Sequence, residues 1–107
     1  MKKDLGVKNR VKEILKIVHQ VSPGNSVELR IPPYAAIQCV PGQVHRRGTP
    51  PNVVEMSGDT LLELVGNPNH WDEFCLKGRI SASGTNANLK DLFIKVSKLD
   101  SGIRLGM

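Results

Sequence analysis

The chain has 107 residues, a length that predicts one domain, residues 1–107, able to bury a core without disulfide or metal support. Hydrophobic residues make up 39% and charged residues 23%, a balance that excludes an intrinsically disordered chain. The formal net charge is +5, and most of the excess lies in residues 1–16, where six basic residues accompany two acidic ones. Nucleic-acid-binding proteins usually spread basic residues over a whole face, so this clustering disfavours nucleic acid as a partner.

The sequence carries no predicted export or membrane segment. The lysines near the N-terminus are not followed by the apolar core of a secretory signal, and no apolar run approaches the roughly 20 residues of a membrane-spanning helix. The two cysteines, Cys39 and Cys75, lie in apolar settings. Because reduced cysteines are the rule in the cytosol, we expect a cytoplasmic protein.

Residues 5–21 have the clearest periodicity in the sequence. Apolar residues recur at spacings of four, three, four and three, which predicts an amphipathic helix with a lysine-rich outer face. They are Val7, Val11, Ile14, Val18 and Val21. A basic amphipathic helix can lie on a membrane, but this apolar face is aliphatic and lacks Trp and Phe, which favours packing against a core. The Ser-Pro-Gly-Asn run that follows ends the helix.

Three strands are predicted next. Residues 27–31 alternate between apolar and polar side chains, as a half-buried strand does. Tyr34–Val40 contains Gln38 as its only strongly polar residue, so we expect this strand at the centre of the sheet. It would pair antiparallel with residues 27–31. Val53–Met56 follows as the third strand.

Two helices are predicted between residues 59 and 77. Asp59 or Thr60 is the expected N-cap of the first, which ends at Gly66. Asn69 is the expected N-cap of the second, over His70–Lys77. Each has apolar residues at spacings of three and four on one face, so both are expected to pack against the core.

One more strand and a closing helix complete the chain. Residues 79–84 alternate in polarity and form a strand that turns Arg79 outward. Asn86 or Asn88 then caps a leucine-rich helix. Residues 100–107 contain two glycines and little pattern, so we expect them to fray.

Residues able to catalyse a reaction or bind a metal are scattered. His19, His45 and His70 stand 25 or more residues apart, and the cysteines lack the CxxC spacing of a zinc site. The phosphate-binding, dinucleotide-binding and serine-hydrolase motifs are absent. We therefore expect no metal, no cofactor and no enzymatic activity.

The segment Gln43–Asn52, with the sequence QVHRRGTPPN, is the strongest polar candidate for a binding site. Its guanidinium groups present paired donors that suit carboxylates and phosphates, which favours an anion-facing loop. The alternative is a rigid, exposed connection whose arginines are solvated. The candidate residues are His45, Arg46, Arg47, Thr49 and Asn52.

The segment DTLLELVGNPNHWDEFCLKGRISASGTNANLKDL, residues 59–92, resembles the C-terminal half of the sterol carrier protein superfamily. The shared features are a helix, a break containing glycine, a second helix ending in Gly78-Arg79, a strand ending in Gly84 and a leucine-rich helix. Thr85 departs from the pattern, because many members carry Asp after that glycine.

A closer similarity is to a short bacterial branch labelled "sterol carrier family protein". It is found at PGNSVELRIPPYAAIQCVPG, at HRRGTPPNVVE and at GRISASGTNANL. Together with the first helix, it covers about residues 7–95. The stretch Arg47–Glu55 is its most specific part.

The resemblance implies an α+β fold, with a mixed sheet of about five strands, helices packed on one face and an apolar tunnel between them. It also implies non-enzymatic binding of a fatty acid, acyl-CoA, sterol or phospholipid. The ligand would lie between the sheet and the helices over residues 61–65 and 71–75, and its acidic head group would meet the loop arginines. The residues expected to line the cavity are Ile37, Val54, Leu61, Val65, Trp71 and Phe74.

Three other functions stay open on the sequence. The first is an accessory interaction protein with a fully packed core, which docks a partner protein through the Gln43–Asn52 loop or the basic helix. The second is a small enzyme that acts on an anionic substrate at residues 45–47. The third is nucleic-acid binding by the basic helix, which would show steep salt dependence.

Overall fold

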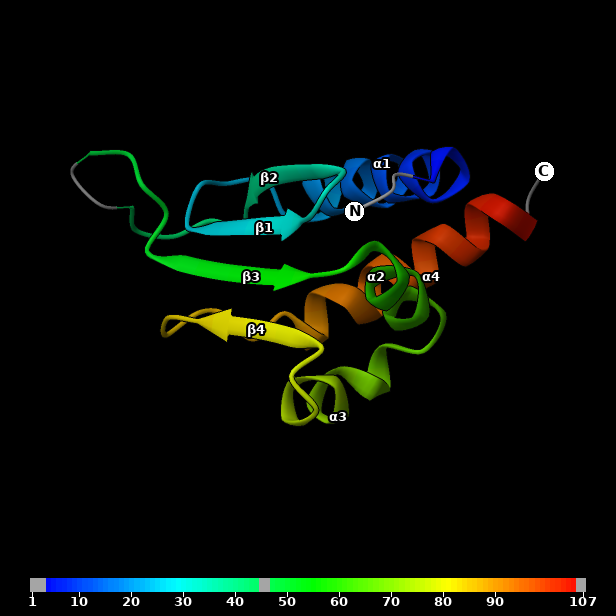
Figure 1. Ribbon diagram of the computed structural model, residues 1–107. Helices are drawn as coiled ribbons and strands as arrows, with labels where there is room; N and C mark the ends of the chain where they lie inside the picture. Colours follow the sequence, from blue (N-terminus) through cyan, green and yellow to red (C-terminus); the bar gives the residue numbers. More distant parts are fainter. Residues whose placement is uncertain (1–3, 45–46, 106–107) are drawn as a thin grey trace.

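The computed structural model describes residues 4–44 and 47–105, and shows helices lying behind a four-stranded sheet (Figure 1). The sheet order is β2-β1-β3-β4, with β1 parallel to β3 and antiparallel to β2, and β3 antiparallel to β4. The elements are α1 (Leu5–Val21), β1 (Val27–Ile31), β2 (Ala35–Cys39), β3 (Asn52–Met56), α2 (Gly58–Gly66), the 3-10 turn η1 (Pro68–His70), α3 (Trp71–Leu76), β4 (Ile80–Ser83) and α4 (Lys90–Leu105).

One face of the sheet is buried beneath the helices and the other is open. Leu29 of β1 is in register with Ile37 of β2 and with Val54 of β3, so the apolar side chains of neighbouring strands share a face. Glu55 and Arg30, on the opposite face, are exposed. The expectation of an α+β fold with a mixed sheet and helices on one face is therefore confirmed.

Two expectations about the sheet are wrong. The described residues form four strands rather than about five, because the segment between β2 and β3 is rich in proline and glycine, which interrupt strands. Strand β2 lies at the edge, not at the centre. Its apolar character has another source: Ala35 and Ile37 lie against α1, while Ala36 and Gln38 face the open side.

Helix α1 has the predicted bounds, and the middle of the predicted stripe, Val11, Ile14 and Val18, is buried, while Val7 and Val21 at its ends are half-buried. The side chain of Asp4 caps it by accepting hydrogen bonds from the backbone N–H groups of Gly6 (2.9 Å) and Val7 (3.2 Å). Two predicted N-caps are wrong. Ser57, not Asp59 or Thr60, caps α2. Asn69 does not cap α3, whose N-cap position is His70 without a side-chain capping hydrogen bond, and Asn67 caps the preceding turn η1.

Helix α4 continues through Leu105, so the expected fraying from residue 100 onward is wrong for the described part of that tail. Asp100 is 5% exposed, and its carboxylate accepts hydrogen bonds from both terminal nitrogens of the Arg10 guanidinium in α1, at 2.8 and 2.5 Å. The residues that form this ion pair are 90 positions apart, so no local pattern reveals it.

Asn52, at the start of β3, is 2% exposed and joins three segments. Its side-chain amide donates to the carbonyl of Ser26 (2.8 Å), and its side-chain oxygen accepts from the backbone N–H of Asn86 (3.0 Å). Gly84 packs so closely that a Cβ there would lie 2.1 Å from the Asn52 side-chain oxygen. Asn52 thus fixes the β4–α4 loop to the start of the sheet.

We expect Gly84→Ala to destabilise the fold more than Gly78→Ala. Both glycines have a left-handed backbone, with φ of 115° and 75°, which costs a residue with a Cβ about 1–2 kcal/mol. Open space surrounds Gly78, so the collision with Asn52 should add about 1–3 kcal/mol at Gly84 alone. Urea unfolding of both variants measures the difference. Equal losses would contradict the close contact.

Asp100→Asn should lower the free energy of unfolding by about 1.5–3 kcal/mol, because it removes the charged partner of a largely buried guanidinium. Ser101→Ala, at an exposed site one residue further along α4, is the control and should change stability by less than about 0.5 kcal/mol. Chemical denaturation of both variants provides the measurement. Similar, small losses of stability in the two variants would mean that this end of α4 is frayed.

Candidate functional site

Five of the six predicted cavity residues belong to the closed core. Each is at most 4% exposed, and the Trp71 ring stacks on Phe93 with the centroids 6.2 Å apart. They are Val54, Leu61, Val65, Trp71 and Phe74. The sixth, Ile37, is half-buried at the edge strand and packs against the core from outside. At the predicted ligand position, the space between sheet and helices holds protein side chains.

Arg79 was predicted to point outward, but its side chain contacts residues of both α2 and α3. Its guanidinium lies 4.2 Å from the centre of the Phe74 ring, donates to the hydroxyl of Thr60 and pairs with Glu63 at 2.6 Å. These contacts connect α2, α3 and the start of β4. The Gly78-Arg79 motif therefore has a structural explanation, which a strand-periodicity argument alone could not supply.

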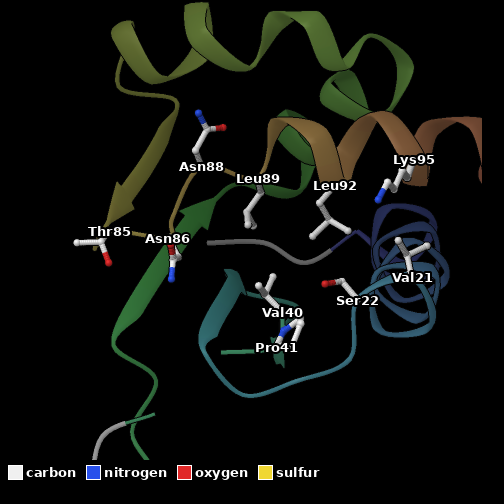
Figure 2. A pocket seen from close by; sticks show the side chains of 10 residues that line it. All are labelled: Val21, Ser22, Val40, Pro41, Thr85, Asn86, Asn88, Leu89, Leu92 and Lys95. Atoms are coloured by element: carbon white, nitrogen blue, oxygen red, sulfur yellow. The ribbon is translucent and has the colours of Figure 1, made fainter. Parts of the chain in front are cut away.

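A cleft of about 510 Å³ opens where the sheet and the helix layer part, and we call it the end cleft. Figure 2 shows Leu89, which directly precedes α4, and Leu92 of α4 on one side, facing Val40 and Pro41 across the opening, with Val21 at the end of α1 nearby. The other lining residues are Ser22, Thr85, Asn86, Asn88 and Lys95. None of the predicted site residues that the structure describes lines it.

The chemistry of the end cleft is amphipathic. Leu89 and Leu92 face Val40 and Pro41 within a lining that is more polar than apolar, and Lys95 and Ser22 lie on opposite walls at the end near Val21 (Figure 2). Among the described residues, the lining contains one cation and no Asp, Glu, His or Cys. Lys95 has no ion-pair partner among the described residues. The cleft can therefore hold an apolar group beside an anion, but it lacks the residue pairs of acid–base or nucleophilic catalysis.

Val40 has a φ of 66°, a left-handed conformation that is rare for a β-branched residue. Its backbone N–H donates to the carbonyl of Ser22 (2.8 Å), and its carbonyl accepts from the N–H (3.1 Å) and hydroxyl (2.8 Å) of Ser26. A Cβ on Gly24 would lie 2.3 Å from the Val40 carbonyl oxygen. The surrounding loop thus holds Val40 in a strained conformation on the cleft wall.

The opposite wall depends on the loop between β4 and α4. Asn86 is held by Asn52, as described above, and the side chain of Asn88 caps α4 by accepting from the N–H of Lys90 at 3.0 Å. The ammonium of Lys90 also lies 3.2 Å from Asp72 of α3. These polar contacts fix the position of Leu89 and Leu92 relative to the sheet.

A second hollow, of about 410 Å³, lies between α1 and the edge strand β2, and we call it the edge groove. Its apolar part is formed by Leu15, Ala35 and Ile37. The remaining lining residues are Lys12, Lys16, His19 and Gln20. An open, largely apolar groove is therefore bordered by basic side chains of one helix.

The predicted anion loop is only partly described. His45 and Arg46 lie outside the described residues. Arg47 and Thr49 are exposed, whereas the Asn52 side chain points into the protein and uses both its oxygen and its amide in structural hydrogen bonds. Asn52 is therefore not a ligand group, and its role explains part of the specific Arg47–Glu55 motif.

The described residues contain no group of three or more His, Cys, Asp or Glu side chains that could hold a metal ion. Burial raises the pKa of the Cys39 thiol to about 11, which keeps it protonated at neutral pH and disfavours a role as nucleophile. Burial also raises the pKa of Cys75, with a contribution from Asp72.

A family model described as "bacterial SCP ortholog" matches residues 5–94. The chain belongs to this family. The match covers α1, the whole sheet and the start of α4, and it includes every lining residue of the end cleft except Lys95. The comparison with curated proteins finds no match. Among the described residues, no helix of this SCP-family chain is both long and apolar enough to span a bilayer.

Thiol labelling should distinguish the two cysteines. Cys75 is partly exposed, whereas Cys39 is fully buried with a raised pKa, so we expect one thiol per molecule to react in the folded protein and two in denaturant. Mass spectrometry of the labelled, digested protein identifies the modified residue. Rapid labelling of Cys39 in the folded protein would mean that the closed core described above opens readily.

Proposed function

We propose that this domain binds, without chemistry, an amphipathic molecule that carries one apolar chain and an acidic head group, and that the chain occupies the end cleft. The supporting observation is the arrangement of Leu89 and Leu92 opposite Val40, with Lys95 at one end of the space between them. Membership of the SCP family agrees with an apolar ligand.

The position of the end cleft favours it over the interior that the sequence predicted. Opening the interior would require displacing side chains such as Leu61 and Trp71, and a buried residue of that size stabilises a core by several kcal/mol. The end cleft needs no such displacement, because its walls are already apart. Each methylene buried there contributes about 0.8 kcal/mol before the cost of association, so a short stretch of chain is enough for measurable binding.

The positive charge of Lys95 in the end cleft favours some of the candidate ligand classes over others. Fatty acids, acyl-CoA and acidic phospholipids combine an acyl chain with an anion, which Lys95 would attract, whereas a sterol offers no negative group. The described residues of the lining include no acidic, histidine or cysteine side chain, which supports binding and transfer rather than catalysis. The two free thiols agree with a cytoplasmic location, which we include in the proposal.

The test is displacement of a dansylated fatty acid by dodecanoate and by dodecanol. Lys95→Glu should weaken dodecanoate binding about tenfold, since it replaces attraction by repulsion beside the bound anion, and should leave dodecanol binding nearly unchanged. Leu92→Trp, which fills the cleft, should weaken both ligands.

Lys98→Glu is the matched control, because Lys98 is exposed on the same helix and does not line the cleft. Its effect on dodecanoate should stay within about twofold. The proposal fails if the protein shows no saturable binding, or if the two lysine variants lose the same affinity.

A further inference from the structure

The edge groove lies beside an unprotected strand edge. Strand β2 is the outer strand of the sheet, and it pairs with no strand except β1 among the described residues. Edge strands expose backbone donors and acceptors to further pairing, and many proteins block this with charged residues on the strand. The β2 sequence, AAIQC, contains no charge.

The groove next to this edge offers an apolar surface on the same side of the sheet as α1. Ala35 and Ile37 of β2 and Leu15 of α1 form it, and both β2 residues are half-buried. A strand added to the outer edge of β2 would direct every second side chain toward this surface, because side chains alternate between the faces of a sheet. A small apolar side chain there would cover Ile37.

The border of the groove is positively charged. Lys12, Lys16 and His19 follow spacings of four and three, which place them on one side of α1, and no acidic residue in the described part of the chain lines the groove. Neither lysine forms an ion pair within the described residues. Acidic side chains on the α1-facing side of an added strand would therefore meet unpaired ammonium groups.

We propose that the edge groove binds an extended, acidic segment of a partner protein, which adds to the sheet as a strand next to β2. Backbone hydrogen bonds to β2 supply affinity. The apolar surface and the basic border of the groove favour a segment in which acidic and apolar side chains alternate along the face turned toward α1. A lipid chain cannot use the exposed backbone groups of β2, so a peptide matches more of the observed features than an acyl chain does.

Self-pairing of two β2 edges is disfavoured by the same charges. It would bring the basic borders of two edge grooves toward one another, and like charges at close range repel. An acidic peptide segment is therefore favoured over a second copy of this chain.

The test uses three synthetic peptides and NMR of the isotope-labelled protein. The first peptide, Ser-Glu-Thr-Val-Thr-Glu-Ser, places two acids and one apolar side chain on one face of a strand. The second replaces both Glu residues by Lys. The third, Ser-Glu-Pro-Pro-Thr-Glu-Ser, keeps the charge but lacks two adjacent backbone N–H groups, so that either edge of the strand is disrupted.

We expect only the first peptide to bind in the millimolar range or tighter, with shifts of the Ile37 methyl group and of the β2 amides. The variant Lys12→Glu/Lys16→Glu should weaken this binding at least about tenfold, which corresponds to about 1.4 kcal/mol. The control variant Lys95→Glu/Lys98→Glu carries the same change in charge on α4 and should bind the peptide within about twofold of the unaltered protein.

Four outcomes would overturn the proposal. They are no binding of the first peptide, equal binding of the proline peptide, a peptide-independent dimer joined through β2, and a tenfold loss of dodecanoate affinity in the Lys12→Glu/Lys16→Glu variant. The last would assign the edge groove to the lipid instead. The lipid proposal is tested at Lys95 and the peptide proposal at Lys12 and Lys16 of α1, so either proposal can fail while the other stands.

Discussion

The buried side chain of Asn52 is the contact on which the geometry of the end cleft depends. It hydrogen-bonds to the carbonyl of Ser26 at the start of β1 and to the N–H of Asn86 before α4. Buried amides without partners are costly, so this arrangement fixes the distance between the sheet and the start of α4. The leucines on the wall of the end cleft follow directly in the chain, and their position relative to Val40 is set by that distance.

The core and the binding surfaces of this domain are separate. Beneath the helices, the apolar face of the sheet is filled by aliphatic side chains and by the Trp71–Phe93 pair, and this packing stabilises the fold. The end cleft and the edge groove lie at its margins, one where the layers part and the other beside α1. An SCP-family chain of this length thus has recognisable hollows without an empty interior.

Periodicity predicted most of the elements, because helix and strand patterns depend on neighbouring residues. The apolar stripe of α1 and the alternation of apolar and polar residues in β1 were enough to predict these two elements. The place of β2 in the sheet was not predictable in the same way, since apolar residues that face a helix occur in an edge strand as well as in a central one. The last turns of α4 contain Asp100, whose ion-pair partner Arg10 lies 90 residues away. The end cleft combines Val40, Lys95 and the Asn86 loop, three parts of the chain that no local motif connects.

The most direct test of the central claim is a methyl-NMR titration of the protein with dodecanoate. If the acyl chain enters the end cleft and the core stays closed, the methyl groups of Val21, Val40, Leu89 and Leu92 will shift, while those of Val54, Leu61 and Val65 will not. Large shifts of the three core residues would contradict this account, because they would place the ligand between the sheet and the helices.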